Sequence, residues 1–162
     1  MPKVIGIDPG LAGTGVGIVT GDGFSIAAYS FGSITTKKSS PLPQRLESIF
    51  SRIRDLLERE APDLLIIEEV FSLHEFPKSG ITLGQVSGVV LLAAAQAAVP
   101  AREVAVREAK QVLTGNGNAS KQQLEKSVRN RLGHPAPIRP YHASDALGLA
   151  LIGLLRYSSI NR

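Results

Sequence analysis

Three carboxylates stand where a carboxylate is costly to bury. Asp8 ends the β-branched apolar run 3–7, Glu68 ends the apolar run 64–67, and Asp145 lies in the first turn of an almost wholly apolar segment. A buried anion needs a partner because its removal from water costs free energy. The acidic first hundred residues offer no obvious arginine beside them. The three positions therefore favour a site for divalent metal ions.

Each of these residues also has an ordinary structural explanation. Asp8 precedes Pro-Gly and could close an Asx turn, and Asp145 could favour the dipole at a helix N-terminus. His142 shares a helix face with Asp145 through its i, i+3 spacing, but it could be a capping or core residue. Glu68 and Glu69 point to opposite faces of an extended chain, so at most one of them faces the site. The combination favours a metal site more than any single residue does.

Other catalytic patterns are missing from the sequence. The chain has no cysteine, which excludes disulfides, iron–sulfur clusters, cysteine-ligated zinc and thiol catalysis. It has no G-x-x-x-x-G-K-[ST] phosphate loop. His74-Glu75 does not complete an H-E-x-x-H motif because Lys78 stands at the last position. These absences leave oxygen ligands and histidine as the chemistry of the site.

Positive charge is concentrated in the last third of the chain. Residues 1–100 carry 8 Lys and Arg against 10 Asp and Glu, whereas residues 101–162 carry 10 against 4. A basic segment is typical of proteins that bind nucleic acid, and a solvated basic face has the same composition.

A polar turn at 115–118 lies within this basic segment, between Lys110 and Lys121. The backbone N–H groups of such a turn could bind phosphate, and the two lysines would add charge. Ser120 could simply cap the helix that follows. Phe71, just past the second carboxylate, could stack on an unpaired base or pack into the core.

The apolar pattern predicts the elements that position these residues. Strands at 3–7, in the glycine-rich stretch after residue 10, and at about 24–34 form an antiparallel meander joined by short turns. Further strands are expected at 64–67, where the run is typical of burial on both faces, and at 102–106. Helices are expected at about 44–60, 80–98, 107–114, 120–132 and 142–157. The order predicts a mixed α/β fold, in which adjacent parallel strands would place Asp8 and Glu68 at one sheet edge.

The helix expected at 80–98 has glycine at every fourth position, namely Gly80, Gly84 and Gly88. These glycines form one flat stripe that allows close packing. We favour packing of this stripe on the sheet, and an interface between two copies of the chain stays open.

Five stretches of the sequence resemble the RuvC Holliday-junction resolvases, which have a ribonuclease-H-like fold. They occur in the family's order and are IGIDPGLAGTGVGIV (5–19), PDLLIIEEVF (62–71), LGQVSGV (83–89), AKQVLTGNGNASKQQL (109–124) and HASDALGLA (142–150). The resemblance implies a single ribonuclease-H-like nuclease domain over 1–162. Its mixed five-stranded sheet would combine an antiparallel meander with parallel strands and carry helices on both faces.

The resemblance also implies catalytic and metal-binding roles for Asp8, Glu68 and Asp145. His142 stands where many members have a fourth carboxylate, and because a neutral imidazole also binds divalent metal, we expect it to join them. The implied cofactor is Mg²⁺, two ions per active site, with Mn²⁺ able to substitute. Glu69 stands where Gln is common in the family and is assigned no role.

DNA contacts are implied for Lys110 and Lys121, and base stacking near the crossover for Phe71. The implied enzyme is a crossover junction endodeoxyribonuclease that acts in homologous recombination and DNA repair. A homodimer would nick a four-way DNA junction symmetrically, leave 5′-phosphate and 3′-hydroxyl ends, and cooperate with the RuvA–RuvB branch-migration complex.

We expect a bacterial cytoplasmic location without a membrane segment. The N-terminus lacks the apolar core of a signal peptide, and the longest apolar run, 89–95, is far shorter than a membrane span.

Two other functions stay open on the sequence. Asp8-Pro9-Gly10 also resembles the first phosphate loop of actin-like and sugar-kinase ATPases, although those proteins need two such domains around the nucleotide. His142 in place of a carboxylate favours a non-catalytic junction-binding protein of the same fold. ATP binding tests the first alternative, and metal-dependent turnover tests the second.

Overall fold

A single mixed sheet organises the chain. The computed structural model describes residues 1–70 and 77–160; for residues 158–160 it describes the backbone alone. The strands are β1 (Lys3–Asp8), β2 (Gly13–Gly21), β3 (Ile26–Thr35), β4 (Leu64–Glu68) and β5 (Ala101–Val104). Their order in the sheet is β3-β2-β1-β4-β5, in which β1, β2 and β3 pair antiparallel and β1, β4 and β5 pair parallel. The expected α/β fold with a mixed five-stranded sheet is confirmed.

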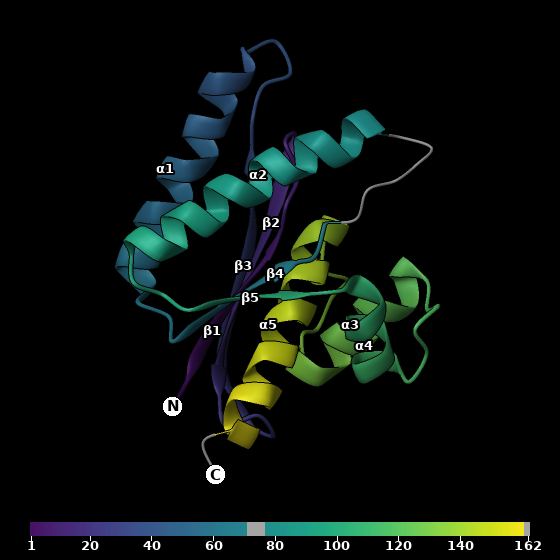
Figure 1. The fold of residues 1–162 in the computed structure, drawn as a ribbon. Helices are drawn as coiled ribbons and strands as arrows, with labels where there is room; N and C mark the ends of the chain where they lie inside the picture. Colours follow the sequence, from purple (N-terminus) through teal and green to yellow (C-terminus); the bar gives the residue numbers. More distant parts are fainter. Residues whose placement is uncertain (71–76, 161–162) are drawn as a thin grey trace.

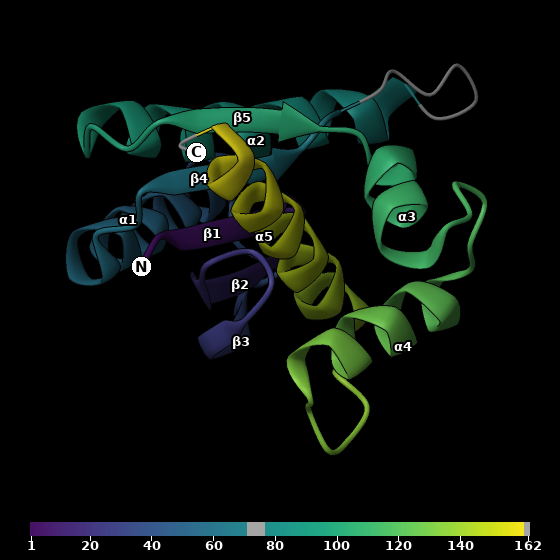
Figure 2. The ribbon, with the colours of Figure 1, turned by 90° about the horizontal axis from the view of Figure 1, so that it is seen from below.

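Helices cover both faces of this sheet (Figures 1 and 2). α1 (Leu42–Glu60) and α2 (Pro77–Gln96) pack on one face, where Ile5, Ile7, Leu65 and Ile67 point into the core. α3 (Val106–Thr114), α4 (Lys121–Leu132) and α5 (Tyr141–Ile160) pack on the other face, over Val4, Val19 and Ile66. Because side chains alternate along a strand, a central strand that is apolar at every position has core on both sides.

Several element boundaries differ by a few residues from those expected, and three of them have a local explanation. β3 begins at Ile26 rather than 24, because the Asp22 carboxylate accepts the backbone N–H groups of Phe24 (3.1 Å) and Ser25 (2.7 Å) and holds them in a turn. α2 begins at Pro77 rather than 80, since proline suits the first turn of a helix, where its missing N–H costs nothing. β5 ends at Val104 because α3 begins two residues later.

Glycines in β1 and β2 let α5 lie directly on the sheet. A Cβ on Gly6 would overlap the backbone oxygen of Ala146, and a Cβ on Gly15 would overlap that of His142. A Cβ on Gly17 would lie 2.5 Å from the backbone nitrogen of Leu147. These small residues therefore fix how closely, and at what height along the strands, α5 packs.

The glycine stripe of α2 does not pack on the sheet. Gly84 and Gly88 are exposed, and a Cβ on either would meet nothing within 4 Å. The interpretation that we favoured for these glycines is therefore wrong for both. Val86, Val90 and Ala93, on the opposite side of α2, supply its contacts with the core.

By length and composition alone α2 could cross a membrane, and it is the one helix in the described part of the chain that meets this test. The helix meets this test although its longest uninterrupted apolar run is short. The residues that interrupt the run are Gly, Ser, Thr and Gln, which carry no charge. An apolar helix packed on a core passes the same test, so this is weak evidence for a membrane.

Candidate functional site

The carboxyl ends of β1 and β4 meet at one edge of the sheet. The two strands are parallel neighbours with Ile7 opposite Ile67, so Asp8 and Glu68 follow side by side. Asp145 lies one turn into α5, which crosses β1 and β2 on the glycine surface described above. Tertiary packing thus brings together three carboxylates from positions that are far apart in the sequence.

The carboxylates interact with one another strongly. Desolvation raises the pKa of Asp8 to about 10, assisted by its side-chain hydrogen bond with Glu68 and by the charges of Glu68 and Asp145. Desolvation and the charge of Glu68 raise the pKa of Asp145 to about 6. The cluster therefore retains a proton at neutral pH unless a cation neutralises it.

Two lysines approach this cluster from the basic part of the chain. The charge of Lys121 opposes the rise in the pKa of both Asp8 and Asp145, and the charge of Lys110 opposes it at Asp145. Their influence is smaller than that of desolvation. The charges of both lysines therefore act on the carboxylates.

His142 lies on the β2–β3 side of the carboxylates. Its Nε2 is 3.1 Å from the hydroxyl of Ser33, and a Cβ on Gly13 would lie 3.0 Å from the same nitrogen. Desolvation and the charge of Lys121 lower the pKa of His142, which favours the neutral imidazole. A neutral imidazole has one ring nitrogen free of a proton, as metal binding or proton acceptance requires.

The donor set fits a divalent metal in its chemistry. Carboxylate oxygens with one neutral imidazole suit Mg²⁺ and Mn²⁺, and because the charges of Glu68 and Asp145 help to raise the pKa of Asp8, a cation bound there would be stabilising. Among residues 1–70 and 77–160, however, no three Asp, Glu or His side chains stand close enough to enclose an ion. Metal binding would therefore require the side chains to draw together.

The polar turn between α3 and α4 does not present free backbone donors. The N–H groups of Asn116, Gly117 and Asn118 donate to the side chains of Thr114, Gln111 and Asn116. Ser120 caps α4 in a reciprocal capping box with Gln123. The hypothesis that this turn binds phosphate through its backbone is therefore wrong, because its donors are already used. Capping is confirmed as the role of Ser120.

Glu69 and Phe71 follow Glu68 in the sequence, and only Glu69 is among the described residues. Glu69 is exposed, and its backbone N–H donates to the carbonyl of Val104 at 2.9 Å. Phe71, for which base stacking was predicted, lies outside the described residues. Its role stays a prediction.

Sequence reasoning missed the hydroxyls that hold the turn after Asp8. The buried Thr14 donates to the carbonyl of Gly10 at 2.7 Å and accepts the Gly10 N–H at 3.4 Å. This N–H is therefore bonded to Thr14, not to Asp8 as an Asx turn would require. The hydroxyl of Thr36 similarly donates to the carbonyl of Leu11. A threonine between glycines in an apolar strand was the available signal.

The chain is similar to known proteins over most of its length. The family model described as "Crossover junction endodeoxyribonuclease RuvC" matches residues 4–153. A protein of that name from Chloroflexus aggregans is 38% identical over 149 residues, which cover 92% of this chain and 90% of the relative. Its counterpart from Carboxydothermus hydrogenoformans is 35% identical over 158 residues, covering 98% and 99% of the two chains.

A solved structure of Thermus thermophilus RuvC in complex with a Holliday junction substrate superposes with a TM-score of 0.90. It is 31% identical, and the match covers 98% of this chain and 96% of that one. The yeast mitochondrial Holliday junction resolvase Ydc2 has a TM-score of 0.62 at 11% identity, covering 98% and 81%, which shows a shared fold alone.

Proposed function

The chain belongs to the RuvC family of crossover junction endodeoxyribonucleases, and from that premise we propose that it resolves four-way (Holliday) DNA junctions by hydrolysing phosphodiester bonds. The observation that carries the proposal is the convergence of Asp8, Glu68 and Asp145 at one sheet edge, where burial and the charge of Glu68 raise the pKa of Asp8 and of Asp145. A protein that only bound junctions would have no need to desolvate three carboxylates beside one another, which is costly.

Family membership suggests dependence on a divalent metal, and Asp8, Glu68, Asp145 and His142 are the residues that would hold it. We propose two Mg²⁺ ions per site, with Mn²⁺ as a substitute. Metal bound there would neutralise the carboxylates and the charge that develops on the phosphate. Ser33 orients the imidazole of His142 through their hydrogen bond.

The surrounding residues support the binding of DNA. The charges of Lys110 and Lys121 act on the carboxylates, and both side chains would contact phosphates of the strand next to the cleaved bond. Phe71 would stack on a base near the crossover. Cleavage of the bond between phosphorus and O3′ would leave 5′-phosphate and 3′-hydroxyl ends.

A homodimer would place two such sites on the two equivalent strands of a junction. The exposed face of α2 is available for this contact, since Ile81, Gly84, Gly88 and Leu92 follow one another at helical spacing and are all exposed. The glycines would allow two helices to approach closely. Cooperation with the RuvA–RuvB complex and a role in recombination and repair belong to the same proposal and rest on family membership.

The test is cleavage of a synthetic four-way junction with Mg²⁺ or Mn²⁺, with cuts mapped on all four strands. The wild-type chain should give paired nicks at symmetric positions, as a two-fold dimer requires. Glu68→Gln should bind the junction as the wild type does and lose cleavage, since it keeps the shape of the side chain and removes its charge. Glu69→Gln, the same change at the exposed neighbouring position, should cleave normally.

Retained cleavage by Glu68→Gln would refute the assignment of the site. Binding without metal-dependent turnover by the wild type would instead favour the non-catalytic junction-binding protein.

A further inference from the structure

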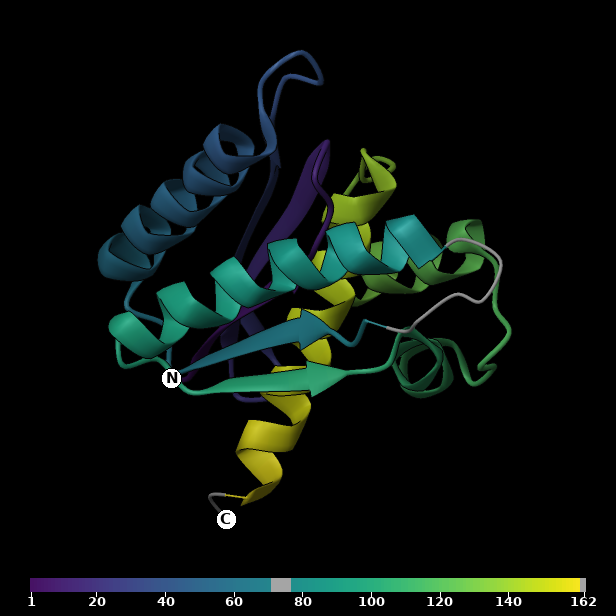
Figure 3. The same cartoon turned by 45° about the horizontal axis from the view of Figure 1, so that its top comes forward.

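A cavity lies near the edge of the sheet that carries Asp8 and Glu68, on the face that α1 covers. The loop between β3 and α1 extends beyond the end of the sheet (Figure 3). Together with the first turns of α1 it encloses a cavity of about 400 Å³, lined by Lys37, Arg45 and Arg52 and by the hydroxyls of Ser40 and Ser48. We propose that this cavity binds a backbone phosphate of the DNA, on the flank of the active site opposite Lys110 and Lys121. The inference rests on the function proposed above.

The charge of the cavity is of one sign. Lys37, Arg45 and Arg52 contribute three cations, and no carboxylate is among the described residues that line it. Within the described chain none of the three forms an ion pair, whereas Arg54 and Arg59 on the same helix pair with Asp55 and Glu60. Cations gathered without acidic partners repel one another, so an anion in the cavity would be stabilising.

The cavity is built on the loop that follows the catalytic Asp8. The Nε of the half-buried Arg45 donates to the hydroxyl of Thr36 at 2.8 Å, and that hydroxyl donates to the carbonyl of Leu11. The N–H of Thr36 donates to the carbonyl of Ala12 at 3.2 Å. Through Thr36, Arg45 is therefore hydrogen-bonded to the turn that follows Asp8. The terminal Nη groups of Arg45 have no partner among the described residues.

The start of α1 adds to the positive potential. The helix begins after Pro41 without a capping side chain, and its first turn contains no acidic residue. Gln44 and Arg45, in that turn, both line the cavity. The positive end of the helix dipole thus acts on the same space as the three cations.

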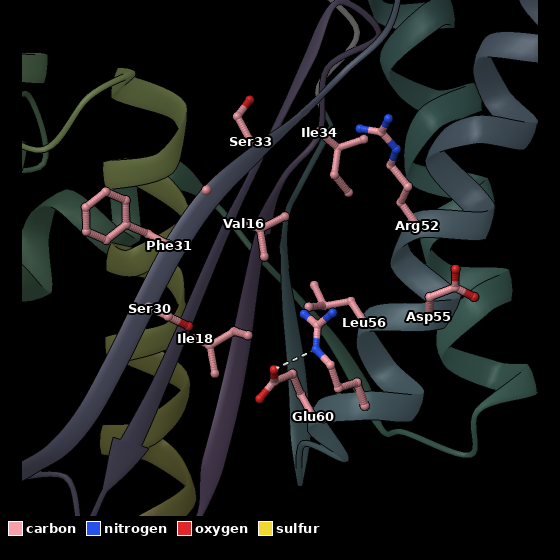
Figure 4. Close-up of a pocket in the computed structure, with 12 residues that line it drawn as sticks. Val16, Ile18, Ser30, Phe31, Ser33, Ile34, Arg52, Asp55, Leu56 and Glu60 are labelled. Carbon is pink, nitrogen blue, oxygen red and sulfur yellow. Dashed lines mark hydrogen bonds and ion pairs between the residues drawn. The ribbon is translucent and has the colours of Figure 1, made fainter.

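A larger neighbouring cavity is a poorer candidate. It has a volume of about 500 Å³ between β3 and α1, and it combines apolar residues, among them Val16 and Ile18, with acidic ones (Figure 4). Its Arg59 is paired with Glu60 at 3.2 Å. Arg52 borders both cavities, and Figure 4 shows it reaching from α1 toward Ile34, near the end of β3. The smaller cavity is the one that selects for an anion.

Phosphate is the anion that this chemistry and position fit. Guanidinium groups and hydroxyls bind the non-bridging oxygens of a phosphodiester without reading sequence. Lys110 and Lys121 serve the α3–α4 side of the carboxylates, and this cavity would serve the α1 side. DNA that crosses the catalytic edge would then be held on both sides of the cleaved bond.

The test compares two double variants in binding to a fluorescent four-way junction without divalent metal. Lys37→Ala with Arg52→Ala removes two lining cations, and Lys38→Ala with Arg54→Ala removes two exposed cations that do not line the cavity. The logarithm of the association constant falls as the logarithm of the salt concentration rises. The first pair should make this slope less steep by about 0.9 for each phosphate that the protein no longer neutralises. The control pair should keep the wild-type slope, although it makes the same change in net charge.

Equal slopes for the two pairs, with wild-type binding and cleavage intact, would overturn the phosphate cavity and leave the proposed function standing. A wild-type chain that does not bind the junction would overturn both. Inorganic phosphate at constant ionic strength distinguishes a free ion from DNA. Displacement of the junction from the wild type, but not from the Lys37/Arg52 variant, would support the DNA contact. Phosphate that binds the wild type and not this variant in calorimetry, while junction binding is unaffected, would assign the cavity to free phosphate and overturn the DNA contact.

Discussion

The packing of α5 on glycine predicts that one methyl group, placed away from the carboxylates, will impair catalysis. A Cβ on Gly17 would lie 2.5 Å from the backbone nitrogen of Leu147, 2.7 Å from its Cα and 2.8 Å from the carbonyl carbon of Ala146. Ordinary contacts of a Cβ are 3.4–4 Å. In Gly17→Ala the helix must therefore retreat by about 1 Å, because backbone atoms have no rotamer by which to yield.

Two effects follow from that displacement. Overpacking of a close-packed interior costs about 1–3 kcal/mol of unfolding free energy. Asp145 lies directly before the displaced turn, so it moves away from Asp8 and Glu68, and a misplacement of about 1 Å can cost on the order of a hundredfold in rate. We expect a lower urea midpoint with unchanged m-value, and slower single-turnover cleavage of a four-way junction at saturating protein.

Gly32→Ala is the matched control. Gly32 lies in β3, the strand next to β2, and its added Cβ would meet nothing within 4 Å. This variant should keep wild-type stability within about 0.5 kcal/mol and cleave normally. If Gly17→Ala were as stable and as active as Gly32→Ala, the contact between α5 and the glycines would not position the site.

Two further predictions concern the charges around the carboxylates. Lys121→Ala should weaken junction binding and make the dependence of the logarithm of the association constant on the logarithm of the salt concentration less steep, by about 0.9 for each phosphate left without its cation. Lys126→Ala on the same helix should change neither. Equal slopes for the two variants would show that Lys121 makes no phosphate contact. In metal-free protein the Asp145 carboxyl, with its pKa raised to about 6, favours folding in acid and loses this contribution as the pH rises from about 4 to 6. Ionisation of Asp145 should therefore lower the free energy of unfolding by at most about 3 kcal/mol between pH 4 and pH 7, and Asp145→Asn should abolish this part of the decrease. Urea unfolding at the two pH values measures it, with the exposed Asp55→Asn as control. An unchanged pH dependence in Asp145→Asn would contradict the desolvation of Asp145.

Much of the fold could be predicted because it depends on local pattern. The apolar runs ending at Asp8 and Glu68 identified two central strands, and the helical spacing of Ile49, Ile53 and Leu57 identified α1. The parallel pairing that puts Asp8 beside Glu68 could be stated only as a condition, since it depends on hydrogen bonds between segments about sixty residues apart.

The direction in which a small residue faces could not be predicted. Gly84 and Gly88 have the regular spacing of a packing stripe and face outward, whereas Gly15 and Gly17, in the glycine-rich stretch where a strand was expected, carry α5. A glycine has no side chain whose polarity would indicate burial, so its role depends on the element that approaches it. The polar turn at 115–118 was misjudged for a similar reason, because its N–H groups are occupied by side chains from both sides of the turn.

The sequence by itself determined the elements, the residue types of the site and the family resemblance, because these depend on the order of residues along the chain. Tertiary structure decided which of the candidate groups meet. It joined Ser33 to His142 across 109 positions, aligned Asp145 with the strand ends through the glycines, and gathered Lys37, Arg45 and Arg52 around one cavity. The physical reason is that desolvation and charge interaction act over a few ångströms in space, and only the folded chain sets which groups lie that close.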